Sequence, residues 1–471
     1  MIQRASDWTA GEIAQAVSGH LRGDPSRRLL GVATDTRDPL ADQLFVALVG
    51  EKHDAHEFLD NAVAGGATAL LVEAQRLTDA RIAALLPRAA LILVEDSTRA
   101  LGDLAQARRR RSKARVTALT GSNGKTSTKE MLAALLSVRH RVLKTQGNLN
   151  NLIGLPLTLL GAQREHEELV LEMGMNRLGE IARMVEIAEP DVGLVTNIGP
   201  AHVGELGGMD NVARAKGEMF RGLSERAYAV VNLDDPRVVE QASAAGVRLR
   251  RTFGRAEEAD VRLLGSTPAG EGQVVRLAVD GTAFEASLPY PGEHNAQNAA
   301  AAVAAATAGC SASLSDLAAG LAAADRVGGR LSAKVVGPWL IIDDSYNANS
   351  ASTLAAIATA SERAKREGRR FVALLGEMRE LGAYAEEEHQ KVGAAAALSG
   401  AALIAAFGPL AGPVAEEAEG RGVSAMHEAK EPGRLFDWLR PQLRPGDLIL
   451  IKGSRGIHME QFLKLLEEGS R

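Results

Sequence analysis

The chain has 471 residues, of which 46% are hydrophobic and 24% are charged, as in ordinary folded globular proteins. This length predicts about three domains. The formal net charge of -5 argues against a nucleic-acid-binding protein, since nucleic-acid surfaces are normally basic. There is no signal-peptide pattern and no run of ~18 apolar residues, so we expect a cytoplasmic protein without a membrane span.

The first 112 residues predict a small α/β domain. The segments GVATDTR, QLFVALVG and ATALLVE are typical of strands, and HEFLDNAVAGG is typical of a helix that ends at glycine. A polar cluster ends the first of these segments: Thr34, Asp35, Thr36 and Arg37. Such a cluster can hold a uracil, ribose or diphosphate by hydrogen bonds and charge, although four polar residues at a strand end are also typical of a turn.

The strongest run of charge is RRRRSKAR, at residues 108–115. A single cluster of this length does not make a nucleic-acid-binding domain. We therefore interpret it as a solvated helix end or as a connector between domains.

Residues 116–129, VTALTGSNGKTSTK, predict a strand, a glycine turn and the start of a helix. This arrangement binds anions, because the free backbone N–H groups and the helix dipole point at the turn. Lys125 suits nucleotide phosphates, and the Thr126 hydroxyl suits magnesium. The common phosphate-loop pattern has a glycine five residues before Gly124, where this chain has Leu119, so the loop is a variant.

From residue 116 onward, apolar strands alternate regularly with helices, and polar residues follow the strands in ELVLEMG, DVGLVTNIG and RAYAVVNLDDP. Ligands bind beyond the carboxyl ends of such strands. Glu172 is a sensible magnesium ligand beside Thr126. His202 is less typical of magnesium and is also consistent with a structural role. A protonated Lys216 would be repelled by a metal ion, so it is either remote from the metal or chemically altered.

Two asparagine-rich turns, GNLNNLIG at 147–154 and GEHNAQN at 292–298, support a nucleotide site, because carboxamides read adenine edges or orient phosphates without adding charge. An alanine-rich run at 299–306 follows and predicts a tightly packed helix. We expect the single cysteine, Cys310, to be a buried thiol; one cysteine excludes an internal disulfide.

A third alternation of strands and helices begins near residue 333, with WLIIDD, RFVALLG, ALIAAFG and DLILIKG as its strands. It predicts a second doubly wound sheet of the Rossmann type that lacks the phosphate glycine pattern. Polar residues end these strands: Asp343, Asp344, Glu377 and Lys452.

Read in order, these motifs resemble those of the Mur ligase family, from TDTR through TGSNGKT, GNLNNLIGLPLT, LEMGMNRLGEI, TNIGPAHVGELGG, ARAKGE and PGEHNAQN to DDSYNANS and IKGSRG. The resemblance implies three α/β domains: residues 1–112 for the UDP-sugar-peptide, a central P-loop parallel-sheet domain at 113–330 for ATP, and a Rossmann-like domain at 331–471 for the incoming amino compound. It also implies an ATP-dependent amide ligase of peptidoglycan synthesis that works through an acyl phosphate, with Mg²⁺ as a cofactor.

The resemblance carries over to individual residues. It assigns to ATP Gly121, Ser122, Asn123, Gly124, Lys125, Thr126, Ser127, Asn295, Asn298, Arg330 and Asp344. It assigns to the metal Thr126, Glu172, His202 and Lys216, the last as a carbamate. It assigns to catalysis Lys125, Glu172, His202 and Lys216. It assigns to the UDP-linked substrate Thr34, Asp35, Thr36, Arg37, Asn150 and Asn151. It suggests for the incoming dipeptide Tyr346, Asn347, Asn349, Lys452, Ser454 and Arg455.

The resemblance also suggests the substrates. DDSYNANS is similar to the member that joins D-alanyl-D-alanine to UDP-N-acetylmuramoyl-tripeptide, apart from Ser350 where a proline is usual, and the DNPR motif of the member that adds the third residue is absent. We expect a monomer with these two substrates. The alternatives are a ligase for a single amino acid, a folylpolyglutamate synthase, or a GTP-hydrolysing switch, which the missing NKxD pattern disfavours.

Overall fold

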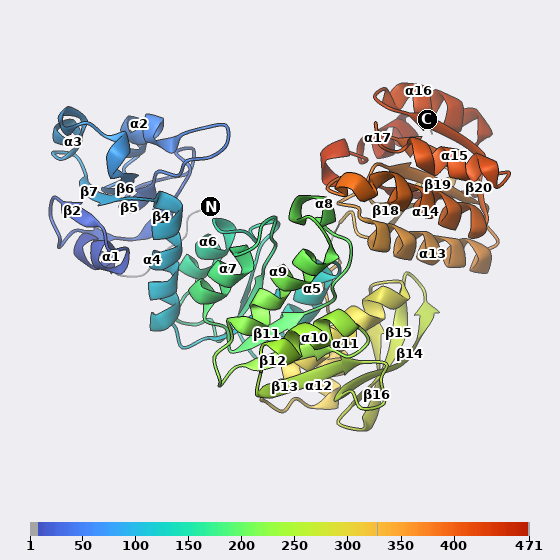
Figure 1. The fold of residues 1–471 in the computed structure, drawn as a ribbon, viewed down its shortest axis with the longest axis horizontal. Coiled ribbons are helices and arrows are strands. Elements are labelled where there is room, and N and C mark those ends of the chain that lie inside the picture. The colour runs from blue at the N-terminus through green and yellow to red at the C-terminus, as the bar shows by residue number, and fades with distance from the viewer. Residues whose placement is uncertain (1–7, 327, 470–471) are drawn as a thin grey trace.

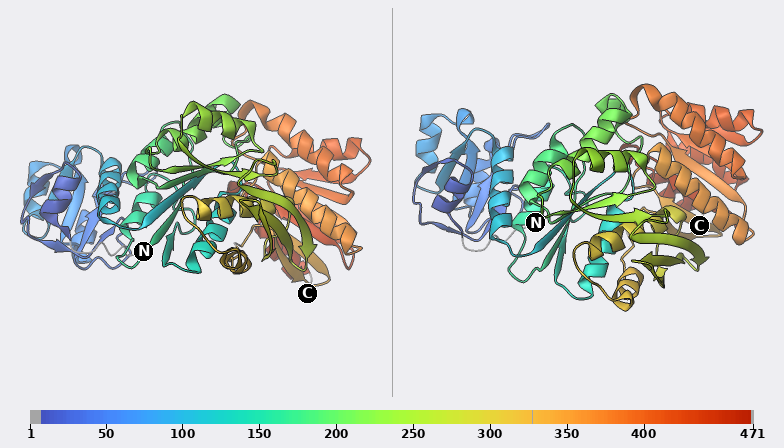
Figure 2. Two further views of the ribbon diagram at one scale, coloured as in Figure 1. Left: turned by 90° about the horizontal axis from the view of Figure 1, so that it is seen from below. Right: turned by 60° about the horizontal axis from the view of Figure 1, so that its bottom comes forward.

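The computed structural model describes residues 8–326 and 328–469, so the outermost residues of the predicted first and last domains, 1–7 and 470–471, lie outside the described chain. Three α/β domains follow one another along an elongated molecule (Figure 1). The N-terminal domain lies at one end, while the central and C-terminal domains lie against each other (Figure 2). The predicted α/β class is confirmed.

The N-terminal sheet has the strand order β2-β7-β6-β5-β4, with only β2 antiparallel to its neighbour among the described strands. Its strands are β2 (His20–Arg22), β4 (Gly31–Ala33), β5 (Gln43–Val46), β6 (Ala69–Glu73) and β7 (Ala90–Val94). Its helices are α1 (Ala10–Ala16), α2 (Leu59–Ala64) and α3 (Asp79–Leu85), and β1 (Trp8–Thr9) pairs with β3 (Arg28–Leu29). Every residue of β4, β5 and β6 is buried, which explains their apolar sequences.

Helix α4 (Ser97–Arg111) connects the first two domains and lies between them (Figure 1). The basic run at its end is used for this contact. Arg108 Nε donates to Ala162 O at 3.1 Å, and Arg109 Nε donates to Ala188 O at 2.9 Å. The interpretation of this run as an interdomain connector is therefore confirmed.

The central sheet has the order β16-β15-β14-β13-β12-β11-β8-β10-β9. The neighbouring strands β14, β13, β12, β11, β8, β10 and β9 run parallel to one another. The strands are β8 (Arg115–Thr120), β9 (Val142–Lys144), β10 (Glu168–Glu172), β11 (Val192–Val195), β12 (Tyr228–Asn232), β13 (Leu249–Gly254), β14 (Val261–Ala269), β15 (Gly272–Val279) and β16 (Thr282–Leu288). Alternate residues of β8 enter opposite cores: Ala118 packs with one helical layer and Leu119 with the other. One layer contains α6 (Gly154–Leu160), α7 (Glu180–Ala188), α9 (Met209–Arg221) and α10 (Pro236–Ala244), and the other contains α5 (Lys125–Ser137), α11 (Glu293–Thr307) and α12 (Leu314–Ala322).

Two features of this domain differ from expectation. The antiparallel strands β15 and β16 extend the sheet, whereas only alternating strands and helices were expected; they form a hairpin whose turn is Asp280-Gly281. Cys310 is exposed rather than buried, because it follows the end of α11, whose alanines are buried as predicted.

The C-terminal sheet has the order β17-β18-β22-β19-β20-β21, with β17 antiparallel and the other pairs parallel. Its strands are β17 (Ser332–Val336), β18 (Trp339–Asp344), β19 (Phe371–Gly376), β20 (Ala401–Phe407), β21 (Ser424–Glu428) and β22 (Leu448–Lys452). Its helices are α13 (Ser350–Arg366), α14 (Ala385–Leu398), α15 (Gly412–Gly420), α16 (Pro432–Leu439) and α17 (Gln461–Gly469). Among the helices of residues 8–326 and 328–469, none is long and apolar enough to cross a membrane.

Candidate active site

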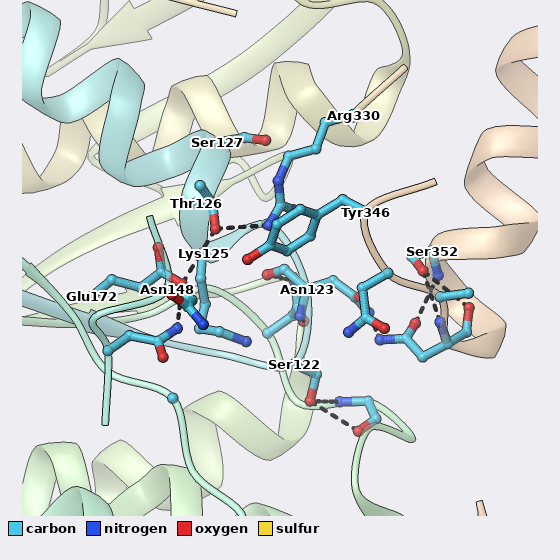
Figure 3. Close-up of a pocket in the computed structure, with 18 of the residues that line it drawn as sticks. Ser122, Asn123, Lys125, Thr126, Ser127, Asn148, Glu172, Arg330, Tyr346 and Ser352 are labelled. Carbon is cyan, nitrogen blue, oxygen red and sulfur yellow. Dashed lines mark hydrogen bonds between the residues drawn. The ribbon is translucent and has the colours of Figure 1, made fainter. Parts of the chain in front are cut away.

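A cavity of about 840 Å³ opens between the central and C-terminal domains, at the carboxyl end of β8 (Figure 3). Most of the residues assigned to ATP or the dipeptide line it: Ser122, Asn123, Gly124, Lys125, Thr126, Ser127, Asn295, Asn298, Arg330, Asp344, Tyr346, Asn347, Asn349, Lys452 and Arg455. It is also lined by Asn150, Asn151, Glu172 and His202. The cavity lies at the strand ends where an α/β sheet binds its ligands.

Two glycines shape the loop that leads into α5. Gly124 has φ +80° and caps the helix, and a Cβ atom there would clash with Asn298 Oδ1. A Cβ atom on Gly121 would clash with Thr196 Oγ1. The loop backbone is held by Asn197, whose Oδ1 accepts from Asn123 N at 2.9 Å. The N–H groups at the start of α5 thus face the cavity as an anion site.

Lys125 and Arg330 bring positive charge to this loop. Lys125 Nζ donates to Gly121 O at 2.7 Å. Arg330 Nη2 donates to Thr126 Oγ1 at 2.9 Å (Figure 3). Burial lowers the pKa of Lys125, with a further lowering by Arg330, while the charges of Glu172 and Glu380 oppose the shift. Two cations next to free N–H groups fit a polyphosphate, which neutralises them.

Glu172 and Thr126 fit a magnesium ion. Glu172 is 2% exposed, and its Oε1 accepts from Asn150 Nδ2 at 2.9 Å and from Thr126 Oγ1 at 3.3 Å. Within the part of the chain that the structure describes, Glu172 Oε2 is buried without a hydrogen-bond donor, and Lys129 Nζ lies 3.7 Å away. A buried carboxylate oxygen without a donor beside a hydroxyl supplies the hard oxygen ligands that Mg²⁺ prefers.

Lys216 and His202 lie at different depths. Lys216 is 1% exposed on α9 and does not line the cavity. Burial, and secondarily the charge of Lys125, lowers the pKa of Lys216 well below its usual value. His202 lines the cavity directly before α8 (Val203–Leu206), with left-handed backbone. The structure therefore places Lys216 behind the cavity wall and His202 on it.

The start of α11 supplies carboxamides to the cavity. Asn298 Nδ2 donates to Asn295 Oδ1 at 3.0 Å, and Asn295 Nδ2 donates to Pro291 O at 2.8 Å. His294, a member of the GEHNAQN segment to which no role is assigned above, also lines the cavity. Burial, with a smaller effect of Lys452, lowers the pKa of His294 to about 4, so the ring is neutral at pH 7. A neutral imidazole ring beside two carboxamides suits an uncharged nucleobase such as adenine.

In the C-terminal domain, Lys452 Nζ donates to Asp344 Oδ2 at 2.6 Å and to Asn347 O at 2.9 Å. Burial raises the pKa of Asp344, and the Lys452 charge opposes this shift. The Tyr346 ring lies 4.4 Å from the Arg330 guanidinium carbon.

Two further residues of this domain differ in their exposure to the cavity. Asn349 caps α13 and donates from Nδ2 to Asn123 Oδ1 at 2.7 Å, so the phosphate loop contacts the third domain. Ser454 is buried and does not line the cavity; its Oγ donates to Ala348 O at 3.3 Å.

The cluster assigned to the UDP-linked substrate lies apart from this cavity. Thr34, Asp35, Thr36 and Arg37 follow β4 in the N-terminal domain and are not part of the cavity lining. Arg37 Nε donates to Asp35 Oδ1 at 2.9 Å, and mainly this bond lowers the pKa of Asp35 to about 2. The cluster therefore contains a solvent-accessible ion pair, Asp35 with Arg37, at the end of a strand.

Several other polar residues that line the cavity were not identified from the sequence: Thr98, Asn148, Asn176, Glu180, Asn197 and Gln297. Most of them lie inside motifs that had been recognised, as Asn148 does in GNLNNLIG and Gln297 does in GEHNAQN. Only the fold shows which members of each motif face the cavity.

Known proteins give an independent comparison. Residues 119–306 match the Mur ligase middle domain, and residues 329–455 match the Mur ligase glutamate ligase domain. The chain is 38% identical over 462 residues to the UDP-N-acetylmuramoyl-tripeptide–D-alanyl-D-alanine ligase of Escherichia coli K12, and the match covers 98% of each chain.

Solved structures agree. The structure of MurF from Acinetobacter baumannii matches with a TM-score of 0.88 and 34% identity, covering 99% of this chain and 100% of that one. The MurF ligase of Thermotoga maritima, solved in complex with ADP, matches with a TM-score of 0.80 and 28% identity over 93% of this chain and 97% of that one. The chain belongs to the Mur ligase family.

Proposed function

We propose that the chain joins D-alanyl-D-alanine to UDP-N-acetylmuramoyl-tripeptide at the expense of ATP, forming the pentapeptide precursor of peptidoglycan. One observation carries the proposal. A single cavity combines a phosphate loop, a buried carboxylate for a metal and the DDSYNANS segment of the third domain. The curated relatives of similar length carry the name of this activity.

The reaction has two steps. A carboxylate oxygen of the tripeptide attacks the γ-phosphorus of ATP, which forms an acyl phosphate and releases ADP. The amine of the dipeptide then attacks the acyl carbon, and inorganic phosphate leaves as the amide forms and a proton is lost. Phosphorylation is needed because a carboxylate is a poor acylating agent. The site must also bring together two anions, the tripeptide carboxylate and the ATP phosphates, which requires nearby positive charge.

The residues of the loop hold ATP for the first step. Lys125 and the N–H groups of 121–126 bind the β and γ oxygens, and Arg330 adds charge from the domain junction. Thr126 and Glu172 would hold Mg²⁺, with His202 at the edge of the site, and the ion would neutralise charge on the phosphates. Asn295, Asn298 and His294 face the adenine, and Asp344 faces the ribose.

Lys216 enters the proposal as a carbamate. Only a neutral amine reacts with CO₂, and burial favours the neutral amine of Lys216. The product is an anion, which removes the repulsion that a protonated lysine would have for a metal ion.

We assign the UDP group of the tripeptide substrate to the N-terminal domain around Thr34 and Arg37. The peptide end of the same substrate is assigned to the part of the cavity next to Asn150 and Asn151. The dipeptide is assigned to Tyr346, Asn347, Asn349, Lys452 and Arg455, while buried Ser454 supports this loop. We propose that one chain suffices for activity and works in the cytoplasm, with domains close to 1–112, 113–330 and 331–471.

The test is phosphate release from ATP with UDP-N-acetylmuramoyl-tripeptide and one of several amino compounds. We expect release with D-alanyl-D-alanine and little release with single amino acids or glutamate. Release with a single amino acid alone would favour another Mur ligase, and glutamate-dependent release with a folate would favour a folylpolyglutamate synthase. GTP bound more tightly than ATP would favour the nucleotide switch.

A further inference from the structure

The loop after β19 carries a carboxylate of the third domain to the metal side of the cavity. Glu380 lies in this loop with φ +67°, and its Oε2 lies 2.8 Å from His202 Nδ1 in the central domain. The backbone repeats the contact, because Gly204 N donates to Glu380 O at 3.0 Å. One backbone hydrogen bond and one close contact between a ring nitrogen and a carboxylate oxygen thus join the same two segments across the domain boundary.

The backbones approach so closely here that side chains are excluded. A Cβ atom on Gly204 would clash with the backbone of Gly382, and a Cβ atom on Gly382 would clash with Gly204. Gly382 begins the short 3₁₀ helix η3 (Gly382–Tyr384), which packs against α8. The contact between Glu380 and His202 is therefore set by shape as well as by charge.

A second acid near the ring gives a comparison within the chain. Glu205 Oε2 lies 3.7 Å from the same nitrogen, but Glu205 belongs to α8, the helix that His202 itself caps. The charge of Lys125 also acts on Glu380 from the phosphate loop. Of the two acids, only Glu380 reports on the position of the third domain.

We propose that Glu380 is a positioning residue that orients His202 for the metal only when the C-terminal domain is docked. This inference rests on the proposed ATP- and Mg²⁺-dependent function. A histidine that binds metal through one nitrogen usually donates its other ring N–H to a carboxylate, which fixes the ring and its tautomer. Here Nδ1 lies 2.8 Å from Glu380 Oε2, so the carboxylate is close enough to take this role and Nε2 is the nitrogen left for the metal. Docking of the C-terminal domain would then complete the metal site at His202 in the same step.

The first test measures docking without metal or nucleotide. Cys310 is exposed in the central domain, and Leu398 is 75% exposed in the C-terminal domain, so spin labels on Cys310 and on Leu398→Cys report the distance between the two domains. We expect Glu380→Ala to broaden the distance distribution or lengthen its mean. The matched variant Glu205→Ala should leave it unchanged.

The second test measures the Mg²⁺ dependence of ligation in the same variants without labels. We expect Glu380→Ala to raise the KM for Mg²⁺ at least tenfold and the KM for ATP less than threefold. Glu380→Gln, which keeps an oxygen acceptor, should lie between the wild type and Glu380→Ala. Thermal melting with a midpoint close to that of the wild type shows that the variants are folded.

Two outcomes would overturn the proposal. One is a Glu380→Ala protein with the distance distribution and Mg²⁺ dependence of the wild type. The other is an equal effect of Glu380→Ala and Glu205→Ala, which would show that His202, Glu205 and Glu380 act as a cation site of their own. A wild-type protein that does not ligate D-alanyl-D-alanine would refute the proposed function instead, and the distance measurement distinguishes the two failures.

Discussion

Arg330 Nη2 donates to the hydroxyl of Thr126 at 2.9 Å, so a residue between α12 and β17 contacts the first turn of α5. The guanidinium also lies 4.4 Å from the Tyr346 ring. The segment that links two domains therefore touches both the phosphate loop and the segment assigned to the dipeptide.

Replacing Arg330 by alanine removes this link. A hydrogen bond to a charged group contributes about 1.5–3 kcal/mol, so kcat/KM for ATP should fall roughly tenfold to 150-fold. Arg330→Lys should recover part of the loss, because it keeps the charge without the planar fork. The exposed Arg326 in the same segment gives the control, and an equal effect of Arg326→Ala would contradict a specific role of Arg330.

Lys125→Ala should abolish most activity. The proposed reaction assigns its ammonium group to the γ-phosphoryl group in transit, so we expect its loss to cost about 3 kcal/mol or more of transition-state stabilisation, a fall of roughly 150-fold in kcat. The melting temperature should not fall, since the variant removes a buried charge. Single-turnover rates with saturating ATP check the result, and near-normal rates would refute the assignment.

Lys216→Ala should be inactive, and formate or acetate should restore part of the activity, because a small carboxylate can replace the carbamate oxygens. Lys125→Ala serves as the control and should not respond to these anions. Initial rates at rising concentrations of formate make the comparison. If both variants fail to respond, Lys216 has a structural role.

His294 should make the protein less stable in mild acid. The pKa of His294 is lowered to about 4 by burial in the folded state and is about 6.5 in the unfolded chain, so between these values the unfolded chain binds more protons. Its contribution to the free energy of unfolding therefore falls as the pH falls from 6.5 to 4.

The variant His294→Gln isolates this effect from other groups that titrate in the same range. Its melting temperature should decline less between pH 7 and pH 4.5 than that of the wild type. The exposed His53 provides the control, and His53→Gln should follow the wild type. A decline as steep for His294→Gln as for the wild type would contradict the prediction.

The parts of the site that the sequence predicted are local. Gly124, Lys125 and Thr126 form one turn between an apolar strand and a helix, and their spacing alone specifies an anion site. Glu172 ends a strand beside β8, and parallel strands bring their carboxyl ends to one edge.

The parts that it did not predict depend on contacts between domains. Glu380 is 178 positions from His202 in the chain, and no periodicity or motif pairs them. The interaction exists because two glycines, Gly204 and Gly382, let two backbones meet. The depth of Lys216 was equally hidden, since the amphipathic pattern of α9 does not show how far a helix lies from a cavity.

In the proposed reaction the tripeptide carboxylate is activated as an acyl phosphate, and oxygen transfer tests this activation most directly. UDP-N-acetylmuramoyl-tripeptide labelled with ¹⁸O in its terminal carboxylate is incubated with ATP and D-alanyl-D-alanine, and the released phosphate is examined by mass spectrometry. We predict one ¹⁸O atom in each phosphate and the other in the new amide. Phosphate without ¹⁸O would mean that water attacks ATP, and it would contradict the account.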